Sequence, residues 1–233
     1  MVADRFHEIR KRITAACERS GRAPEEVTLI AVSKTKPAEL LKEAYEAGAR
    51  DFGENKVQEI LEKYPQLPKD IRWHMIGHLQ TNKVKQVVGK ACLIHSVDSL
   101  RLANEISRES KKQGLTVPIL LEVNVAEEET KFGFRLEETE EALRQIGQLP
   151  AVKVCGLMTI APFVEEGEAN RQIFRKFHQF YVDMKSKNID NITMSILSMG
   201  MTGDFEVAIE EGATMVRVGT GIFGVRRRIG EQS

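Results

Sequence analysis

The sequence has no surplus of charge of either sign, because 34 lysines and arginines are balanced by 34 aspartates and glutamates. Non-specific nucleic-acid binding depends on a basic surface that neutralises phosphates, so the balance argues against a nucleic-acid partner. Long apolar runs are missing too: stretches such as residues 119–125 contain charge and fall short of the roughly 20 residues of a membrane-spanning helix. We therefore expect neither nucleic acid nor a membrane among its partners.

Cysteine is scarce. Cys17, Cys92 and Cys155 lie far apart in the sequence and form no CxxC pair. An odd number at such spacing does not predict a disulfide framework, a metal site or a redox motif. We expect three buried, free thiols and no metal, in a reducing cytoplasm.

The N-terminal segment has no signal-peptide run. It places Phe6, Ile9 and Ile13 at helical spacing among charged residues, which predicts an amphipathic helix and a protein that stays in the cytoplasm. The basic run 226–228 is the densest cluster of positive charge. We interpret it as a solvated tail.

Short β-branched runs alternate with longer helical patterns along the rest of the chain, as in βα units that feed a parallel sheet. The predicted strands cover residues 27–34, 51–54, 72–77, 92–97, 118–125, 153–160, 193–199 and 215–219. The predicted helices cover residues 37–47, 55–64, 81–88, 99–113, 136–146, 168–186 and 204–210. Pro37 suits a first helical turn, Gly48 and Gly114 suit positions just past a helix, and Ser99 and Asp204 suit N-caps.

Eight such strands favour a closed (β/α)8 TIM barrel with an extra N-terminal helix, since a barrel closes at eight strands. The alternative is an open, doubly wound sheet. No linker, repeat or low-complexity tract interrupts the series, so residues 1–233 are predicted to form a single domain.

In such barrels the functional groups follow the carboxyl ends of the strands. The first strand is predicted to end in Lys34, with Lys36 already turning toward the next helix at Pro37. A lysine at the mouth of an apolar cavity loses solvation, which lowers its pKa and frees the amine for Schiff-base chemistry. A snorkelling surface lysine is the alternative interpretation.

The loops after the seventh and eighth strands combine hydroxyls with glycines, at Ser198 to Gly200 and at Gly219 to Gly221. Barrels commonly bind phosphate at these two loops, because glycine lets backbone N–H groups approach an anion. A lysine and a phosphate cradle on one barrel face are what a pyridoxal 5′-phosphate (PLP) site requires.

Arg217 precedes the second of these loops. A guanidinium stays protonated and only donates, so it can face a pyridine nitrogen only if that nitrogen is unprotonated. A PLP ring held in this way is a poor electron sink. A barrel-wall ion pair is the alternative interpretation.

Other polar strand ends are less specific. His74 is interpreted as a hydrogen-bonded barrel histidine, facing inward or outward according to register. Asn124 needs a partner if it is buried. Met158, Met199 and Met201 suit either a soft wall against a ring or ordinary core packing.

Six segments together resemble the PLP homeostasis protein family, whose members are single-domain PLP-binding proteins related to the barrel domain of alanine racemase, fold type III. The segments are AVSKTKP (31–37), FGEN followed by VQE (52–59), WHMIGHLQTNK (73–83), GLMTI (156–160), LSMGM (197–201) and MVRVGTGIFG (215–224). The resemblance runs from about residue 25 to residue 226.

The resemblance assigns Lys34 to the Schiff base with PLP and Arg217 to the pyridine nitrogen. Phosphate contacts are implied for Ser198, Gly219 and Thr220, and further cofactor contacts for Asn55, Met199 and Gly200. It also implies a protein that buffers, carries or delivers PLP in vitamin B6 and amino-acid homeostasis, without catalytic turnover. Apart from the resemblance, we expect a monomer in the cytoplasm, with PLP-dependent apoenzymes as partners.

A racemase would need a second proton carrier on the opposite ring face. Tyr45, Tyr64 and Tyr181 all fall in predicted helices, and a short tail is all that the sequence has after Gly224. We therefore expect a binding protein rather than an enzyme. The alternatives are a PLP-dependent amino-acid racemase or decarboxylase, and a regulatory module that uses PLP as its signal.

Overall fold

The computed structural model describes residues 1–128 and 130–225, so the basic run 226–228 lies outside the described residues. Eight parallel strands form a closed barrel in the order β1 to β8, and β8 pairs with β1. They are β1 (Thr28–Val32), β2 (Asp51–Glu54), β3 (Arg72–Met75), β4 (Ala91–Val97), β5 (Val117–Glu122), β6 (Val152–Met158), β7 (Ile192–Met201) and β8 (Met215–Val218). The barrel prediction is confirmed, and the open doubly wound sheet is excluded because the sheet closes.

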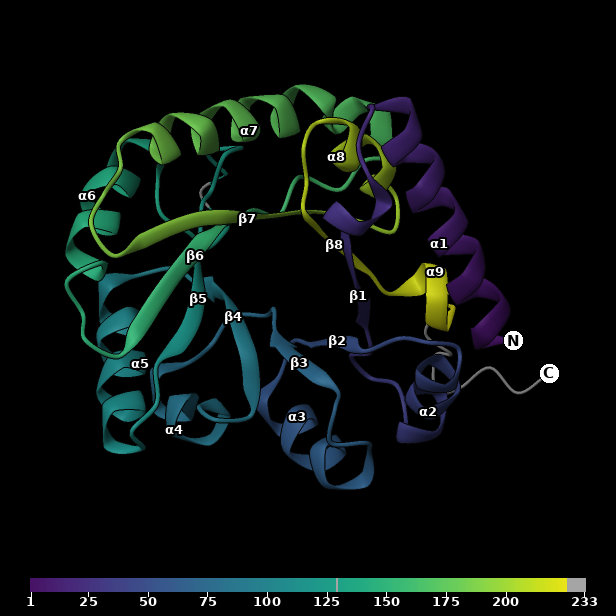
Figure 1. Cartoon of the computed structure of the whole chain (residues 1–233), viewed down its shortest axis with the longest axis horizontal. Coiled ribbons are helices and arrows are strands. Elements are labelled where there is room, and N and C mark those ends of the chain that lie inside the picture. Colours follow the sequence, from purple (N-terminus) through teal and green to yellow (C-terminus); the bar gives the residue numbers. More distant parts are fainter. Residues whose placement is uncertain (129, 226–233) are drawn as a thin grey trace.

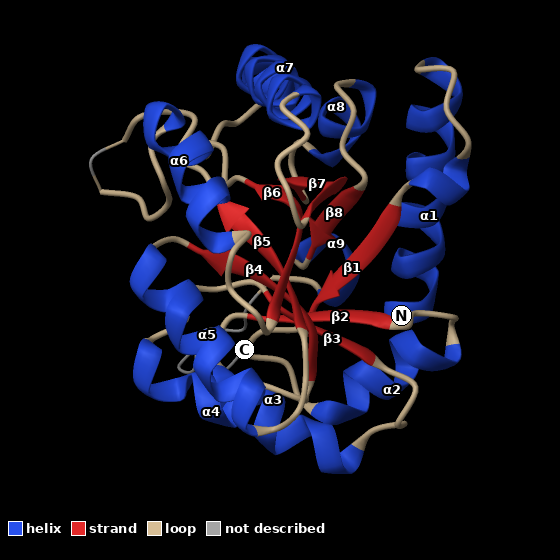
Figure 2. Ribbon diagram, turned by 60° about the vertical axis from the view of Figure 1, so that its left-hand side comes forward, coloured by secondary structure: helices blue, strands red, loops and turns tan. Residues whose placement is uncertain are grey.

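A ring of helices surrounds this barrel (Figures 1 and 2). They are α1 (Val2–Arg19), α2 (Ala38–Glu46), α3 (Val57–Lys63), α4 (Val84–Val87), α5 (Leu100–Lys112), α6 (Leu136–Ile146), α7 (Arg171–Ser186), α8 (Phe205–Glu210) and α9 (Thr220–Phe223). Short 3-10 turns at Thr81–Lys83 and Gly167–Asn170 precede α4 and α7, so both α-helices begin later than predicted. The short α9 was not predicted.

The predicted N-terminal helix is present as α1. Its apolar stripe, which includes Phe6, Ile9 and Ile13, is buried. It packs beside α8 and α9, at the junction where the first and last βα units meet (Figure 1). This helix therefore covers the region in which the barrel closes.

Several predicted helix ends have the expected geometry. Gly48 and Gly114 follow the C-caps of α2 and α5 with φ of 105° and 67°. The Ser99 hydroxyl accepts the Leu102 N–H at 3.3 Å, as an N-cap does. Pro37 is the N-cap of α2 rather than a residue of its first turn, because its ψ of 157° is extended.

The apolar residues form a main core between the sheet and the helices, and a small cluster inside the barrel made of Leu93, Leu120, Cys155 and Met158. Buried His74, His95 and Arg217 also lie in the barrel wall, so part of the interior is polar.

Two of the three thiols, Cys17 and Cys155, are buried as predicted, but Cys92 is half-buried. Cys92 lies at the start of β4 and lines a cavity there, which the sequence pattern does not reveal. In the described part of the chain, none of the helices has the length and apolar character needed to cross a bilayer.

Candidate functional site

Lys34 lies in a tight turn directly after β1 and is half-buried. The prediction that the strand continues through Lys34 is wrong: β1 ends at Val32, and the Lys36 N–H donates to the Ser33 carbonyl at 3.0 Å to close a turn. Thr35 has φ of 62°, a left-handed conformation that is costly for a β-branched residue. The turn therefore needs outside support.

A cluster of charged side chains supplies that support. The Lys63 Nζ donates to the Ser33 carbonyl at 2.9 Å, to Glu54 Oε1 at 2.7 Å and to Glu59 Oε2 at 2.8 Å. The Ser33 hydroxyl donates to Glu54 at 2.6 Å, and the Thr35 N–H donates to Glu59 at 2.6 Å. The cluster thus fixes both neighbours of the lysine in the turn.

Burial shapes the ionisation of this cluster. It raises the pKa of Glu54 to about 7, against the hydrogen bonds from Lys63 and Ser33. Burial also acts to raise the pKa of Glu59, but the hydrogen bonds from Lys63 and the Thr35 N–H outweigh it and hold that pKa below its usual value. Glu54 Oε2 is buried without a hydrogen-bond partner.

Lys36 has a different role from Lys34. Its Nζ donates to the carbonyls of Phe223, Gly224 and Val225 at 3.3, 2.9 and 3.3 Å. These bonds tie the turn after β1 to the segment that follows α9.

Asn55 follows β2 and is half-buried beside a cavity of about 540 Å³ that Met75, His78 and Leu79 also line. The loop after β3 approaches it closely: a Cβ on Gly77 would lie 2.5 Å from the Asn55 carbonyl oxygen. A glycine is therefore required at residue 77 if Asn55 is to keep this place at the barrel mouth.

Backbone donors converge on a hydroxyl beside β8. The Gly219 N–H donates to Thr202 Oγ1 at 3.2 Å and the Gly221 N–H donates to it at 3.4 Å. Thr220 begins α9 and is exposed. Sequence reasoning missed Thr202, because a threonine after the LSMGM segment has no special pattern.

The β7 residues of the predicted phosphate loop have different environments. Met199 is fully buried and belongs to the main core, and its contact with PLP stays a prediction. Gly200 has φ of 90°, and a Cβ there would lie 2.5 Å from the Ala208 Cβ, so the glycine lets α8 pack against β7.

Ser198 and Arg217 are buried inside the barrel. Arg217 Nη1 donates to Ser198 Oγ at 2.6 Å, and Nη2 donates to the Thr159 carbonyl at 2.8 Å. Burial lowers the pKa of Arg217 to about 10, although Glu122 and Asp204 oppose the shift. The guanidinium remains charged at neutral pH. The phosphate role of Ser198 stays a prediction, since this hydroxyl already accepts from Arg217.

Closure of the barrel brings the predicted residues of β1, β2, β7 and β8 to neighbouring strand ends (Figure 2). Asn124 does not belong to this group. The prediction that it ends the fifth strand is wrong, because β5 ends at Glu122; its amide donates to the Glu128 carbonyl at 2.8 Å in the following loop. Glu122 itself is buried, and burial raises its pKa to about 7.

His74 faces the barrel interior and contacts His95 and Asp51, in agreement with its interpretation as a hydrogen-bonded barrel histidine. His95 was missed, because its partners lie on other strands. Within residues 1–128 and 130–225, no group of three or more His, Cys, Asp or Glu side chains is arranged to hold a metal ion.

Residues 7–227 match the family model described as "Alanine racemase, N-terminal domain". A pyridoxal phosphate homeostasis protein from Aquifex aeolicus is 47% identical over 97% of this chain and 99% of that protein. The protein of the same name from Escherichia coli K12 is 37% identical over 97% of each.

Solved structures agree with these relatives. PipY of Synechococcus elongatus PCC7942, solved with PLP bound, is 35% identical with a TM-score of 0.83, over 96% of this chain and all (100%) of that one. Alanine racemase of Clostridium difficile 630 is 14% identical with a TM-score of 0.75, over 97% of this chain and 58% of that one, a likeness of fold alone.

Proposed function

Since the chain belongs to the family of pyridoxal phosphate homeostasis proteins, within the alanine racemase N-terminal domain family, we propose that it binds PLP at the carboxyl end of its barrel. Its role is to hold the cofactor and release it in intracellular vitamin B6 homeostasis, with PLP-dependent apoenzymes as recipients and without catalytic turnover. The chain acts as a monomer in the cytoplasm.

The residues at this end fit the chemistry of PLP. Lys34, in a braced turn, carries the amine to which an aldehyde would bind. The backbone N–H groups of Gly219 and Gly221, which donate to the Thr202 hydroxyl, belong to the glycine loop after β8, where we place the phosphate. Arg217 supplies a cation that only donates, which suits an unprotonated ring nitrogen.

One observation carries the proposal. The turn that bears Lys34 and the donor loop after β8 are neighbours, because β1 pairs with β8 and Lys36 bonds to the carbonyls of residues 223–225. This pairing supports a site in which the amine of Lys34 and the glycine loop after β8 bind one ligand. When bound, PLP supplies an aldehyde that forms a covalent link with an amine and a ring that withdraws electrons.

The positions of the tyrosines support a role without turnover. The Tyr45 hydroxyl donates to Asp70, and the Tyr181 hydroxyl donates to the Met194 carbonyl, each at 2.7 Å. Tyr64 lines a cavity beside the first residues of β3, β4 and β5, at the opposite end of the barrel. Each tyrosine is therefore committed away from the carboxyl mouth, where a second proton carrier would be needed.

The test of binding is the visible absorbance of the PLP-loaded protein before and after borohydride. We expect a visible band that reduction abolishes while the cofactor stays attached. A protein that acquires no visible band with PLP would contradict the proposal.

The test of turnover is incubation of the loaded protein with L-alanine, L-serine or L-lysine in deuterated water. We expect no racemisation and little α-deuterium incorporation. Racemisation faster than about 1 s⁻¹, the low end of ordinary enzymes, that disappears in Lys34→Ala would instead establish a racemase.

A further inference from the structure

A chain of hydrogen-bonded side chains connects Arg217 with the amino end of the barrel. His95 Nδ1 lies 3.0 Å from Ser198 Oγ, which also accepts from Arg217. His95 Nε2 lies 3.0 Å from His74 Nδ1, and His74 Nε2 lies 3.0 Å from Asp51 Oδ1. This series of hydrogen-bonded side chains is continuous from β2 to β8.

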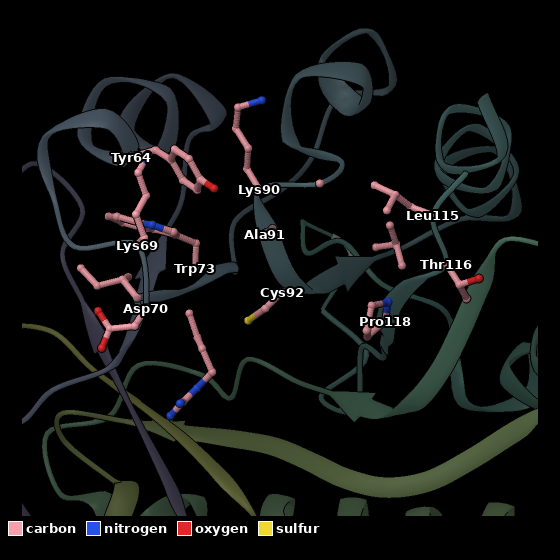
Figure 3. A pocket seen from close by; sticks show the side chains of 14 residues that line it. Tyr64, Lys69, Asp70, Trp73, Lys90, Ala91, Cys92, Leu115, Thr116 and Pro118 are labelled. Atoms are coloured by element: carbon pink, nitrogen blue, oxygen red, sulfur yellow. The ribbon is translucent and has the colours of Figure 1, made fainter. Parts of the chain in front are cut away.

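Its far end opens on a cavity of about 380 Å³ at the starts of β3, β4 and β5. Arg72 lines this cavity and donates to Asp51 Oδ1 at 2.7 Å. The Cys92 sulfur lies among the lining side chains (Figure 3) and is 3.6 Å from His74 Nε2. Solvent at this mouth therefore reaches the groups that surround His74.

Asp51, which only accepts, and Arg217, which only donates, fix the direction of the two end bonds, and the direction of the two bonds made by His95 follows from the protonation of His74. Asp51 is an acceptor, so His74 Nε2 carries a proton. With His74 protonated on both nitrogens, Nδ1 donates to His95 Nε2, and the single proton of a neutral His95 is on Nδ1. His95 then donates to Ser198 Oγ, whose two acceptor positions are filled by His95 and Arg217.

We propose that His74 and His95 are positioning residues that hold Arg217 in place through Ser198, and so set the environment of the PLP ring from the opposite end of the barrel. This inference rests on the proposed function. Arg217 has few other anchors: the Thr159 carbonyl is its other hydrogen-bond partner in the described residues, at 2.8 Å.

The ionisation of the two imidazoles agrees with this direction. Burial acts to lower the pKa of His74, but the contacts with Asp51 and Cys92 outweigh it and raise the pKa to about 9. Burial, followed by the charges of His74 and Arg217, lowers the pKa of His95 well below its usual value. His74 is therefore the charged member of the pair and His95 the neutral one.

The groups facing this pair are few. Asp51 on β2 and Cys92 on β4 face His74, and Arg72 on β3 acts on it through Asp51. The charges that face Arg217 are Glu122 at the end of β5 and Asp204 before α8.

The test compares three variants. His95→Leu breaks the series of hydrogen bonds from Asp51 to Arg217. His95→Gln keeps an acceptor and a donor and so can bridge His74 and Ser198. Cys92→Ser is the matched control, because it changes a contact of His74 that is not part of the hydrogen-bonded series. If His95→Leu does not fold, His95→Asn replaces it, since its side chain is too short to reach both partners.

We expect His95→Leu to bind PLP about tenfold more weakly, the order of one lost hydrogen bond, and to move the pH midpoint of the visible band upward, since a loosened cation stabilises the unprotonated imine less. His95→Gln and Cys92→Ser should match the parent within about twofold. In the protein without PLP, NMR should show faster exchange of the Arg217 guanidinium protons in His95→Leu and not in His95→Gln.

The outcomes separate the two proposals. A parent without a visible band, but with Arg217 protons that depend on His95, would contradict PLP binding and keep the positioning role. A folded His95→Leu with an unchanged band, midpoint and Arg217 exchange would overturn the positioning role. A lowered thermal stability without those changes would overturn it as well, since it would show that His95 is only structural.

Discussion

The turn that carries Lys34 and the guanidinium of Arg217 belong to neighbouring strands, but they are held by different kinds of interaction. Lys63, Glu54 and Glu59 brace the Lys34 turn with two ion pairs of 2.7 and 2.8 Å. Arg217 is held by an uncharged hydroxyl and a backbone carbonyl. One half of the site therefore depends on buried charge pairing, and the other on hydrogen bonds from a buried guanidinium to uncharged acceptors.

This difference indicates which property of the protein a substitution in each half of the site should change. Removing one member of a buried ion pair leaves an unpaired charge, which costs far more than the pair contributes. A hydrogen bond between a charged group and an uncharged acceptor contributes about 1.5–3 kcal/mol, less than the cost of an unpaired buried charge. The Lys34 side should therefore respond mainly in stability, and the Arg217 side mainly in the properties of the ligand.

The largest effect is expected for Lys63→Met, which removes the ion pairs with Glu54 and Glu59 that support the Lys34 turn. It leaves the Glu54 carboxylate buried beside the turn without its cation, so the free energy of unfolding should fall by about 3–5 kcal/mol. Urea denaturation at pH 8 measures it. Lys42→Met, at an exposed position of α2, is the control, with a change within about 0.5 kcal/mol. A Lys63→Met protein as stable as the parent would show that the ion pairs of Lys63 with Glu54 and Glu59 do not stabilise the fold.

The second effect is the pH dependence of stability, to which His74 contributes. The pKa of His74 is raised from 6.5 to about 9 in the folded protein, so the folded state binds the proton more tightly than the unfolded state does. Its contribution is complete below pH 6.5 and is lost as pH rises through 9. His74 should account for about 3 kcal/mol of the stability that the parent loses across this window; Glu54 and Glu122, whose pKa values burial raises to about 7, add smaller losses of their own.

Urea denaturation of the protein without PLP at pH 6 and at pH 9.5 measures this loss. His74→Gln should remove most of it. His78→Gln should retain it, since His78 is an exposed histidine paired with Asp98 at 2.8 Å. Equal pH dependence in the parent and His74→Gln would show that the proton is bound elsewhere.

The smallest effects concern the loop after β8, where we propose that the phosphate binds. Thr202→Val removes the hydroxyl that accepts from the Gly219 and Gly221 N–H groups and orients the loop after β8, and should weaken PLP binding about 10- to 100-fold while leaving pyridoxal binding unchanged. Ser198→Ala separates the two roles open to that residue. A loss confined to PLP would establish the predicted phosphate contact, and equal losses for PLP and pyridoxal would assign Ser198 to the support of Arg217.

The alternation of apolar strands and amphipathic helices was enough to predict the barrel, because eight such units close. It also placed Lys34, Arg217 and the glycine loops near strand ends. The exact strand limits were harder: β1 stops before Lys34 because the Lys36 N–H turns back to Ser33, a local hydrogen bond that no apolar pattern reports.

Partners across strands could not be predicted. His74 and His95 meet although a register shift interrupts the pairing of β3 with β4 between Trp73 and His74, and a shift of one residue reverses which side chains face inward. Lys63 reads as a surface residue of an amphipathic helix, yet it is 6% exposed. Its burial follows from the cluster with Glu54 and Glu59, which the fold alone assembles.

The most direct measurement is the site of covalent attachment. PLP-loaded protein is reduced with borohydride, digested and mapped by mass spectrometry, in the parent, Lys34→Ala and Lys36→Ala. The account predicts the cofactor mass on Lys34 in the parent and in Lys36→Ala, and no visible band in Lys34→Ala. Label on Lys36, or a Lys34→Ala protein that keeps the visible band, would contradict it.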